Sequence, residues 1–220
     1  MRAFRLAYDG RPFYGFQRQP DVPTVEGTLF DALRSLSVLS TDADRPEGYA
    51  AAGRTDAGVS ALAQTVAFDC PDWLRPRALN SELPGTVRAW ASADVGPDFH
   101  ATHHAVRRVY TYYLYAPQQA DRGLDGRSPV DDEQAAAALD GLCGFHDFHN
   151  LTPDDHGSQR GLSGRLDRDG EWLVIEVAAG GFARELVRRL VSVVRIVGTG
   201  ERPVDWIDDL LGPERVDPRP

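Results

Sequence analysis

The segment Gly53-Arg-Thr-Asp-Ala-Gly-Val-Ser60 places one carboxylate, Asp56, and one guanidinium, Arg54, between glycines. An ionised carboxylate can attack a substrate or take a proton from it. Small apolar residues precede the segment and a strand-like alternation follows it, so we expect a loop between two strands, where chemistry is often carried. An ordinary Thr-Asp turn with permissive glycines fits the same spacing, and the spacing alone leaves both interpretations open.

Other patterns that could carry chemistry are weaker. The six histidines fall into two groups, but their spacing is poor for zinc and no Cys pair completes a ligand set, so we expect no metal site. A phosphate loop of the G-x-x-x-x-G-K-[ST] type needs lysine, which the chain lacks, and neither a G-x-G-x-x-G nor a G-x-S-x-G motif is present. The two cysteines, Cys70 and Cys143, are far apart and predict no disulfide framework.

Two further segments combine arginines with apolar side chains. Residues 11–18 interleave aromatic rings with Arg11 and Arg18, which suits base stacking and phosphate contact but equally suits a hydrophobic loop packed on the core. Residues 182–197 have helical periodicity, with Arg184, Arg188 and Arg195 on one stripe beside the apolar face. These arginines could meet a carboxylate or a phosphate, or extend over the core into solvent.

Composition and charge limit the kinds of protein that this chain could be. The chain has 220 residues, is 42% apolar and carries a net charge of −9, and all 24 basic residues are Arg. A polyanionic partner would then need a local Arg patch, and the acidic balance suggests an organism with a salty cytoplasm. No apolar run reaches the roughly 20 residues of a membrane span, and the start lacks the apolar core of a signal peptide, so we predict a cytoplasmic protein without membrane contact.

The first hundred residues predict strand, helix, strand, strand, helix, strand. The first strand alternates over 3–8, Thr24 is the expected N-cap of the first helix, and the catalytic candidate lies between the second and third strands. A short helix over 76–83 and a strand over 86–93 complete the set. This order is that of the ferredoxin-like (split βαβ) arrangement, which by itself names no function.

The second half begins in the same way. We expect a strand over 107–115, a loop over 123–129, a helix over 131–142, strands around Arg165 and over 172–178, and helices over 182–197 and 204–211. The polar stretch 152–164 is predicted to be a mobile loop. After Gly212 no run fits a closing strand, so the second sheet is expected to be one strand short or the chain to be truncated.

Four segments in this order resemble the TruA family of tRNA pseudouridine synthases, and the match covers most of the chain. They are Tyr8-Asp-Gly10 through Phe13-Tyr-Gly-Phe-Gln17, Gly53-Arg-Thr-Asp-Ala-Gly-Val59, Phe99-His-Ala101 with Arg108-Val-Tyr-Thr-Tyr112, and Phe182 through Arg188. The chain differs from the usual family pattern at Phe16, Ser60 and Thr102, where Trp, His and Arg are more common. The resemblance favours the catalytic interpretation of the Asp56 loop.

The resemblance implies a role for several residues. Asp56 matches the catalytic aspartate that acts in breaking the glycosidic bond of uridine, and Arg188 matches the active-site arginine that would keep it ionised. Tyr110 matches the tyrosine that stacks on the flipped uracil, and Arg54 matches the residue that holds the flipped state. The substrate-binding candidates are Gln17, Phe16, Arg11, Arg18, Arg107 and Arg108.

The resemblance also implies the fold, the substrate and the assembly. It predicts an α+β pseudouridine synthase fold with two ferredoxin-like (RRM-like) halves, 1–98 and 99–220, whose antiparallel sheets join into one central sheet with helices on one side. The substrate would be the anticodon stem-loop of tRNA at positions 38, 39 and 40, bound by a homodimer, with no cofactor. The alternatives are a non-catalytic RNA-binding module that has kept the fold, and a carboxylate hydrolase that would need a second acid near Asp56.

Overall fold

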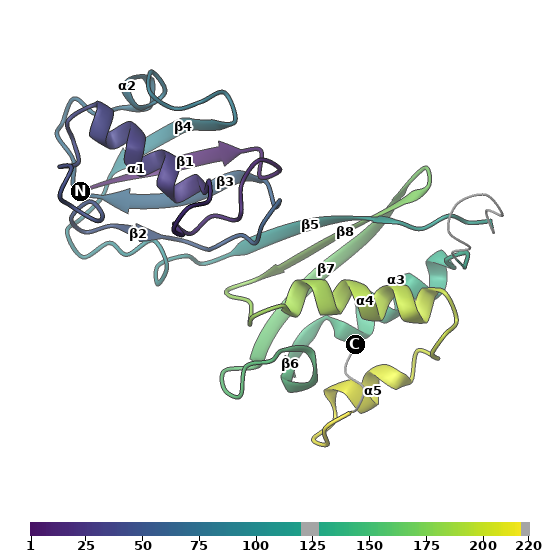
Figure 1. Ribbon diagram of the computed structural model, residues 1–220. Coiled ribbons are helices and arrows are strands. Elements are labelled where there is room, and N and C mark those ends of the chain that lie inside the picture. The colour runs from purple at the N-terminus through teal and green to yellow at the C-terminus, as the bar shows by residue number, and fades with distance from the viewer. Residues whose placement is uncertain (120–127, 217–220) are drawn as a thin grey trace. The chain divides into compact units, whose positions relative to one another are not determined.

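The computed structural model describes residues 1–119 and 128–216 and divides into two compact units, Met1–Ala105 and Val106 onward. Each unit combines helices with one four-stranded antiparallel sheet, which gives a mixed α/β architecture (Figure 1). The predicted loop over 123–129 lies mostly outside the described residues.

The first unit has the predicted order of elements. It runs β1 (Arg2–Tyr8), α1 (Val25–Ser35), β2 (Ala50–Ala51), β3 (Ala61–Phe68), α2 (Pro76–Leu79) and β4 (Val87–Asp94). The strands are arranged in the order β2-β3-β1-β4, so the first strand of the chain lies inside the sheet, between β3 and β4. Helix α2 is shorter than predicted and ends at Leu79.

Side-chain alternation and helix capping explain the first unit. Phe4, Leu6 and Tyr8 of β1 are buried against α1, and the rings of Phe4 and Phe68 stack with centroids 5.1 Å apart. The side chain of Thr24 accepts a hydrogen bond from the Gly27 amide at 3.2 Å, which satisfies an otherwise unpaired donor at the start of α1. The predicted N-cap is therefore confirmed.

The second unit contains more elements than the sequence predicted. It runs β5 (Arg108–Tyr115), α3 (Asp132–Leu142), β6 (Gly144–Asp147), the 3-10 helix η1 (His149–Leu151), β7 (Gln159–Asp169), β8 (Trp172–Ala179), α4 (Leu186–Gly198) and α5 (Trp206–Leu211). The sheet order is β5-β8-β7-β6, with every neighbouring pair antiparallel.

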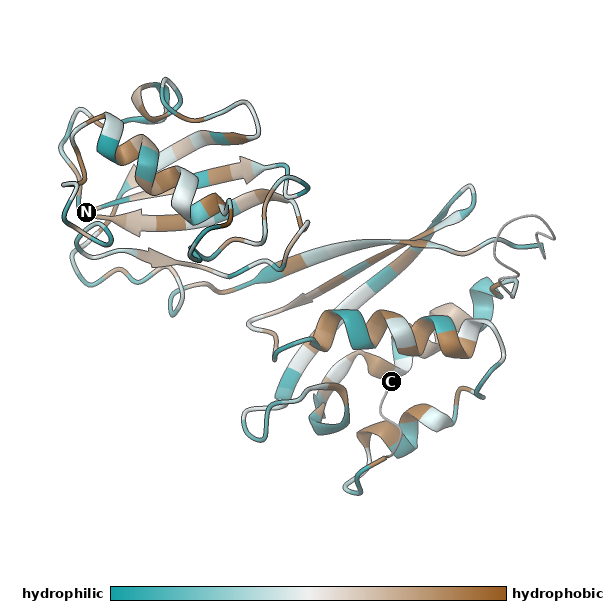
Figure 2. Cartoon of the chain, in the orientation of Figure 1, coloured by the Kyte–Doolittle hydropathy of each residue, from teal (hydrophilic) through white to brown (hydrophobic). Residues whose placement is uncertain are grey.

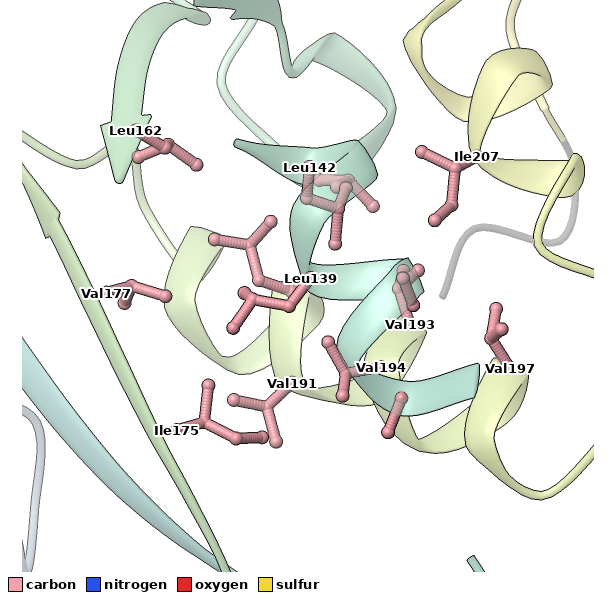
Figure 3. Close-up of a cluster of buried hydrophobic side chains, with 14 of the residues drawn as sticks. Leu139, Leu142, Leu162, Ile175, Val177, Val191, Val193, Val194, Val197 and Ile207 are labelled. Carbon is pink, nitrogen blue, oxygen red and sulfur yellow. The ribbon is translucent and has the colours of Figure 1, made fainter. Parts of the chain in front are cut away.

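Helices α3 and α4 pack together on this sheet. Hydrophobic residues recur along α4 (Figure 2), and their side chains are buried against those of α3 and β8. Figure 3 shows Leu139 of α3, Val194 of α4 and Val177 of β8 within one cluster of buried side chains. This cluster of buried side chains therefore positions the N-terminal end of α4, which carries Arg188.

Two predicted element boundaries in the second unit are wrong. The predicted loop over 152–164 is a strand from Gln159 onward. The sequence hides this strand because glycines interrupt its side-chain alternation, and at Gly164 a side chain of α3 approaches the backbone closely. A Cβ on Gly164 would lie 3.0 Å from Leu139 Cδ1 and 3.3 Å from the Cys143 sulfur. Helix α4 begins at Leu186 and not at residue 182, because Glu185 has a left-handed backbone with φ 63°.

Among the helices in residues 1–119 and 128–216, none is both long and apolar enough to cross a membrane.

Candidate active site

Asp56 and Arg54 lie in the exposed loop that joins β2 to β3. The loop backbone is fixed on both sides of Asp56. The Gln64 side chain donates to the Gly53 carbonyl at 2.7 Å, and the Tyr8 and Thr55 hydroxyls are 2.8 Å apart. The amide of Val59 donates to the Asp56 carbonyl at 3.2 Å and closes a tight turn. The Asp56 carboxylate therefore stands on a backbone that hydrogen bonds hold in place, between the ends of two strands. A catalytic group needs such support to keep its geometry.

The loop after β1 packs directly on the Asp56 loop. The amide of Phe16 donates to the Thr55 carbonyl at 3.0 Å, and the amide of Gly58 donates to the Phe13 carbonyl at 3.1 Å. The amide of Gly10 also donates to the Ser60 hydroxyl at 2.9 Å. These three hydrogen bonds join two segments that are far apart in sequence, on both sides of Asp56.

Two glycines make this contact possible. A Cβ on Gly10 would lie 2.1 Å from the carbonyl oxygen of Val59, which no side chain could occupy. Gly15 has φ +105°, and a Cβ there would lie 3.1 Å from the Thr55 carbonyl oxygen. Sequence reasoning did not single out either glycine, although both stand in the first of the four family segments.

The substrate-binding candidates of the first unit differ in exposure. Phe16 is fully buried with its ring 6.1 Å from that of Tyr8, so it supports the loop from the core, whereas Gln17 is exposed. Arg11 and Arg18 are exposed and form ion pairs with Asp9 at 2.6 Å and Asp44 at 3.2 Å. A phosphate would have to compete with these two carboxylates.

The hydrogen bonds from Arg11 hold the pKa of the Asp9 carboxyl below its usual range. Asp9 therefore stays ionised at neutral pH and keeps Arg11 close to the Gly10 turn.

Two candidates of the second unit, Tyr110 and Arg108, contact residues 180–185, a segment that we name the α4 entry turn. Tyr110 of β5 packs edge-on against Phe182 of this turn, with ring centroids 5.1 Å apart and planes at 87°. The Arg108 guanidinium donates to the Gly180 carbonyl. Arg107 is exposed just before β5.

Arg188 lies exposed in the first turn of α4. The prediction that Arg184 shares a helical stripe with it is wrong, because Arg184 precedes the left-handed Glu185 and lies in the α4 entry turn. The Arg184 Nε atom is 3.3 Å from Asp154, and Arg195 forms an ion pair with Glu201 at 3.0 Å.

The histidine groups have local contacts. The rings of His100 and His103 lie 4.2 Å apart, and His146 Nε2 is 2.8 Å from the Cys143 carbonyl oxygen. His149 Nδ1 is 3.4 Å from Asp147. Over residues 1–119 and 128–216, no three His, Cys, Asp or Glu side chains come together in a way that could hold a metal ion.

Comparison with known proteins identifies similar sequences over nearly the whole chain. A family model described as tRNA pseudouridine synthase matches residues 135–219. The chain is 58% identical to the tRNA pseudouridine synthase A of Haloarcula marismortui over 216 residues, which are 98% of this chain and 78% of that protein.

The protein of the same name from Natronomonas pharaonis is 60% identical over 211 residues, 96% of this chain and 75% of that protein. A more distant relative with this name, from Methanosarcina mazei, is 38% identical over 229 residues, 99% of this chain and 80% of that protein.

Proposed function

This chain belongs to the TruA family of tRNA pseudouridine synthases, which isomerise uridine in tRNA, and we propose that its Asp56 loop is the site of that reaction. The observation that carries the proposal is the placement of Asp56, a carboxylate exposed on a backbone that contacts from β1, β3 and the 10–16 loop hold rigid. The alternative of a non-catalytic RNA-binding module is not favoured by the high identity to named synthases.

The reaction is an isomerisation, so no atom is gained or lost overall. The bond between C1′ of the ribose and N1 of uracil breaks, the base rotates, and a new bond forms between C1′ and C5. C5 then gives up its proton to solvent and N1 takes one up, so the formula is unchanged. Asp56 would attack the sugar or take a proton from it, and either role requires a carboxylate. We assign Arg188 as the cation that balances this carboxylate, by its match to the family motif at the start of α4.

The uracil must leave its stack before it reaches the carboxylate, at a cost of a few kcal/mol. We assign Tyr110 as the ring on which the flipped base stacks. Its edge-on contact with Phe182 fixes the orientation of its plane, which a stacking surface needs. Arg54, two residues before Asp56 and exposed, is assigned to the space that the flipped base leaves.

We assign the anticodon stem-loop of tRNA as the substrate, with positions 38, 39 and 40 as the modified uridines, and a homodimer as the active assembly. Gln17 and Arg107 are exposed and would contact the RNA directly. Phe16 is buried and would support the loop that carries Gln17. Arg11, Arg18 and Arg108 would contact phosphates, the first two by exchanging a carboxylate for the RNA backbone. No cofactor is required, and a cytoplasmic location follows from the substrate.

We also propose that the chain consists of two ferredoxin-like halves, 1–98 and 99–220, whose sheets join into one central sheet with helices on one side. The strand order β2-β3-β1-β4 and the element order of the first unit support this for the first half. In the second unit β5, α3, β7, β8 and α4 follow the order of types of β1, α1, β2, β3 and α2, with β6 added at the edge beside β7.

Replacement of Asp56 tests the assignment. Asp56→Ala should abolish tritium release from tRNA that carries 5-tritiated uridine, because the C5 proton leaves only after the glycosidic bond has been broken. Binding of tRNA by the variant should persist. Asp98→Ala removes another exposed carboxylate of the same unit and should release tritium at the wild-type rate. Unchanged release by Asp56→Ala would refute the assignment.

A further inference from the structure

The α4 entry turn contains a residue in an unfavourable backbone conformation. Glu185 has φ 63° and ψ −3°, in the left-handed region that a residue with a Cβ rarely adopts. It stands at the N-cap position of α4, and its side chain makes no capping hydrogen bond. Such a conformation persists only where neighbouring contacts impose it, and it occurs preferentially at functional sites.

The contacts that impose it come from the segment between η1 and β7, which the sequence predicted to be mobile. Asp154 Oδ2 accepts a hydrogen bond from the Arg184 amide at 3.0 Å, and Thr152 Oγ1 donates to the Arg184 carbonyl at 2.9 Å. These two bonds fix both peptide groups of Arg184, directly before the left-handed residue. We name Thr152 and Asp154 the clamp.

The clamp is itself ordered. Thr152 is fully buried, and its hydroxyl also accepts a hydrogen bond from the Asp154 amide at 3.1 Å. The hydrogen bond from the Arg184 backbone holds the pKa of the Asp154 carboxyl below its usual range. The side chain of Arg184 adds an ion pair at 3.3 Å. Asp154 therefore remains an acceptor at the pH at which an enzyme of this class would act.

The clamped turn supports the two catalytic assignments of this unit. Phe182, at its start, packs against the ring of Tyr110. Arg188 follows Glu185 by three residues, and the Arg189 amide donates to the Glu185 carbonyl at 3.1 Å, so the direction of the first turn of α4 is set by the conformation of Glu185. A change in this turn would therefore alter both the Phe182 support of the Tyr110 ring and the direction of Arg188.

We propose that Thr152 and Asp154 are positioning residues for uridine isomerisation, which hold the α4 entry turn in its left-handed conformation so that Tyr110 and Arg188 are presented correctly. This inference rests on the proposed function, because it requires Tyr110 and Arg188 to take part in the isomerisation. The clamp touches neither substrate nor reacting atoms.

Kinetics of clamp variants test the proposal. Asp154→Ala and Thr152→Val should lower kcat by about 10- to 100-fold, the scale of a misplacement of about 1 Å, with KM for tRNA little changed. Asp155→Ala is the matched control, since the carboxylate of this neighbouring residue is exposed and faces Arg215 at 3.8 Å. Arg184→Ala keeps the backbone bond to Asp154 and should lose less activity than Asp154→Ala.

A rescue separates positioning from general stability. Glycine adopts the left-handed conformation without a clamp, so Glu185→Gly should restore most of the kcat that Asp154→Ala loses. The single Glu185→Gly variant serves as the reference, because it also removes the ion pair between Glu185 and Arg189. Thermal unfolding of every variant shows whether each is folded at the assay temperature.

The outcomes are distinct. Wild-type kcat in Asp154→Ala, beside an inactive Asp56→Ala, would overturn the clamp and leave the proposed function intact. Wild-type kcat in Asp56→Ala would overturn the proposed function itself. A loss in Asp154→Ala that Glu185→Gly does not relieve would show that the clamp acts through stability and not through the left-handed turn.

Discussion

The carbonyl oxygen of Val59 lies where a Cβ on Gly10 would have to be, at 2.1 Å. Gly10→Ala should therefore push the 10–16 loop away from the Asp56 loop, lower activity more than tenfold by the scale of misplaced catalytic groups, and destabilise the first unit by about 1–3 kcal/mol through overpacking. Urea unfolding and tritium release measure the two effects. Gly85→Ala adds its methyl group to open space and should change neither. A fully active Gly10→Ala would contradict this role of the contact.

The types and spacing of the residues predict part of the candidate active site. Asp56 and Arg54 stand out because a charged pair between glycines is unusual, and the Thr24 cap follows from a local rule. The clamp residues Thr152 and Asp154 could not be found in this way. Their partner Arg184 is some 30 residues away along the chain, and a polar stretch with no periodicity resembles any mobile loop.

Among the elements, α3 is tied to β7 by one ion pair. Asp132, in the first turn of α3, accepts hydrogen bonds from two nitrogens of Arg168, and these hold the pKa of its carboxyl below the ordinary value of 3.8. A carboxyl with a lowered folded-state pKa contributes stability above its unfolded pKa and loses it as the pH falls through the folded pKa. The pair should therefore stabilise the second unit at neutral pH and not in strong acid.

The prediction is that wild type is more stable than Asp132→Asn at pH 7, and that the difference shrinks below about pH 4. Urea unfolding at a series of pH values measures it. Glu133→Gln changes an exposed carboxylate in the same helical turn and should show a smaller, flatter difference. A gap between wild type and Asp132→Asn that persisted at pH 2 would show that the carboxylate charge is not the cause.

The spacing of apolar residues predicts some helices and strands of this chain and misses parts of others. Alternation identified β1, and apolar spacing identified α1, because each presents one face to a core. Strand β7 was partly missed because its glycines interrupt the alternation of apolar and polar residues, and at Gly164 the Leu139 side chain of α3 lies 3.0 Å from where a Cβ would be. Helix α4 was predicted to begin too early because its apolar spacing continues through Phe182 and Ala183, although Glu185 interrupts the helix.

At the scale of the whole molecule, the charge balance is the dominant feature. The chain carries 33 acidic residues against 24 arginines, and two of its relatives come from the halophilic archaea Haloarcula marismortui and Natronomonas pharaonis. Self-repulsion of this net charge opposes the folded state at low ionic strength, and salt screens it within a Debye length of about 3 Å at 1 M. The sequence predicted this acidic surface directly, because net charge needs no knowledge of the fold.

We therefore expect the midpoint of thermal unfolding to rise as KCl increases from about 0.01 M to above 1 M, the range over which screening becomes nearly complete. A chain with the same midpoint in dilute buffer and in molar salt would contradict the account of the acidic surface. Binding of tRNA should weaken over the same range with a slope set by the number of arginine–phosphate contacts.

Nucleotide-resolution mapping of pseudouridine tests whether this chain isomerises uridine in tRNA through Asp56. Unmodified tRNA is incubated in molar KCl with wild-type chain, with Asp56→Asn, or with Asp98→Asn, and then mapped. Wild type and Asp98→Asn should form pseudouridine at positions 38, 39 or 40, and Asp56→Asn should form none. Pseudouridine formed equally by Asp56→Asn, or none formed by folded wild type that binds the tRNA, would contradict this assignment.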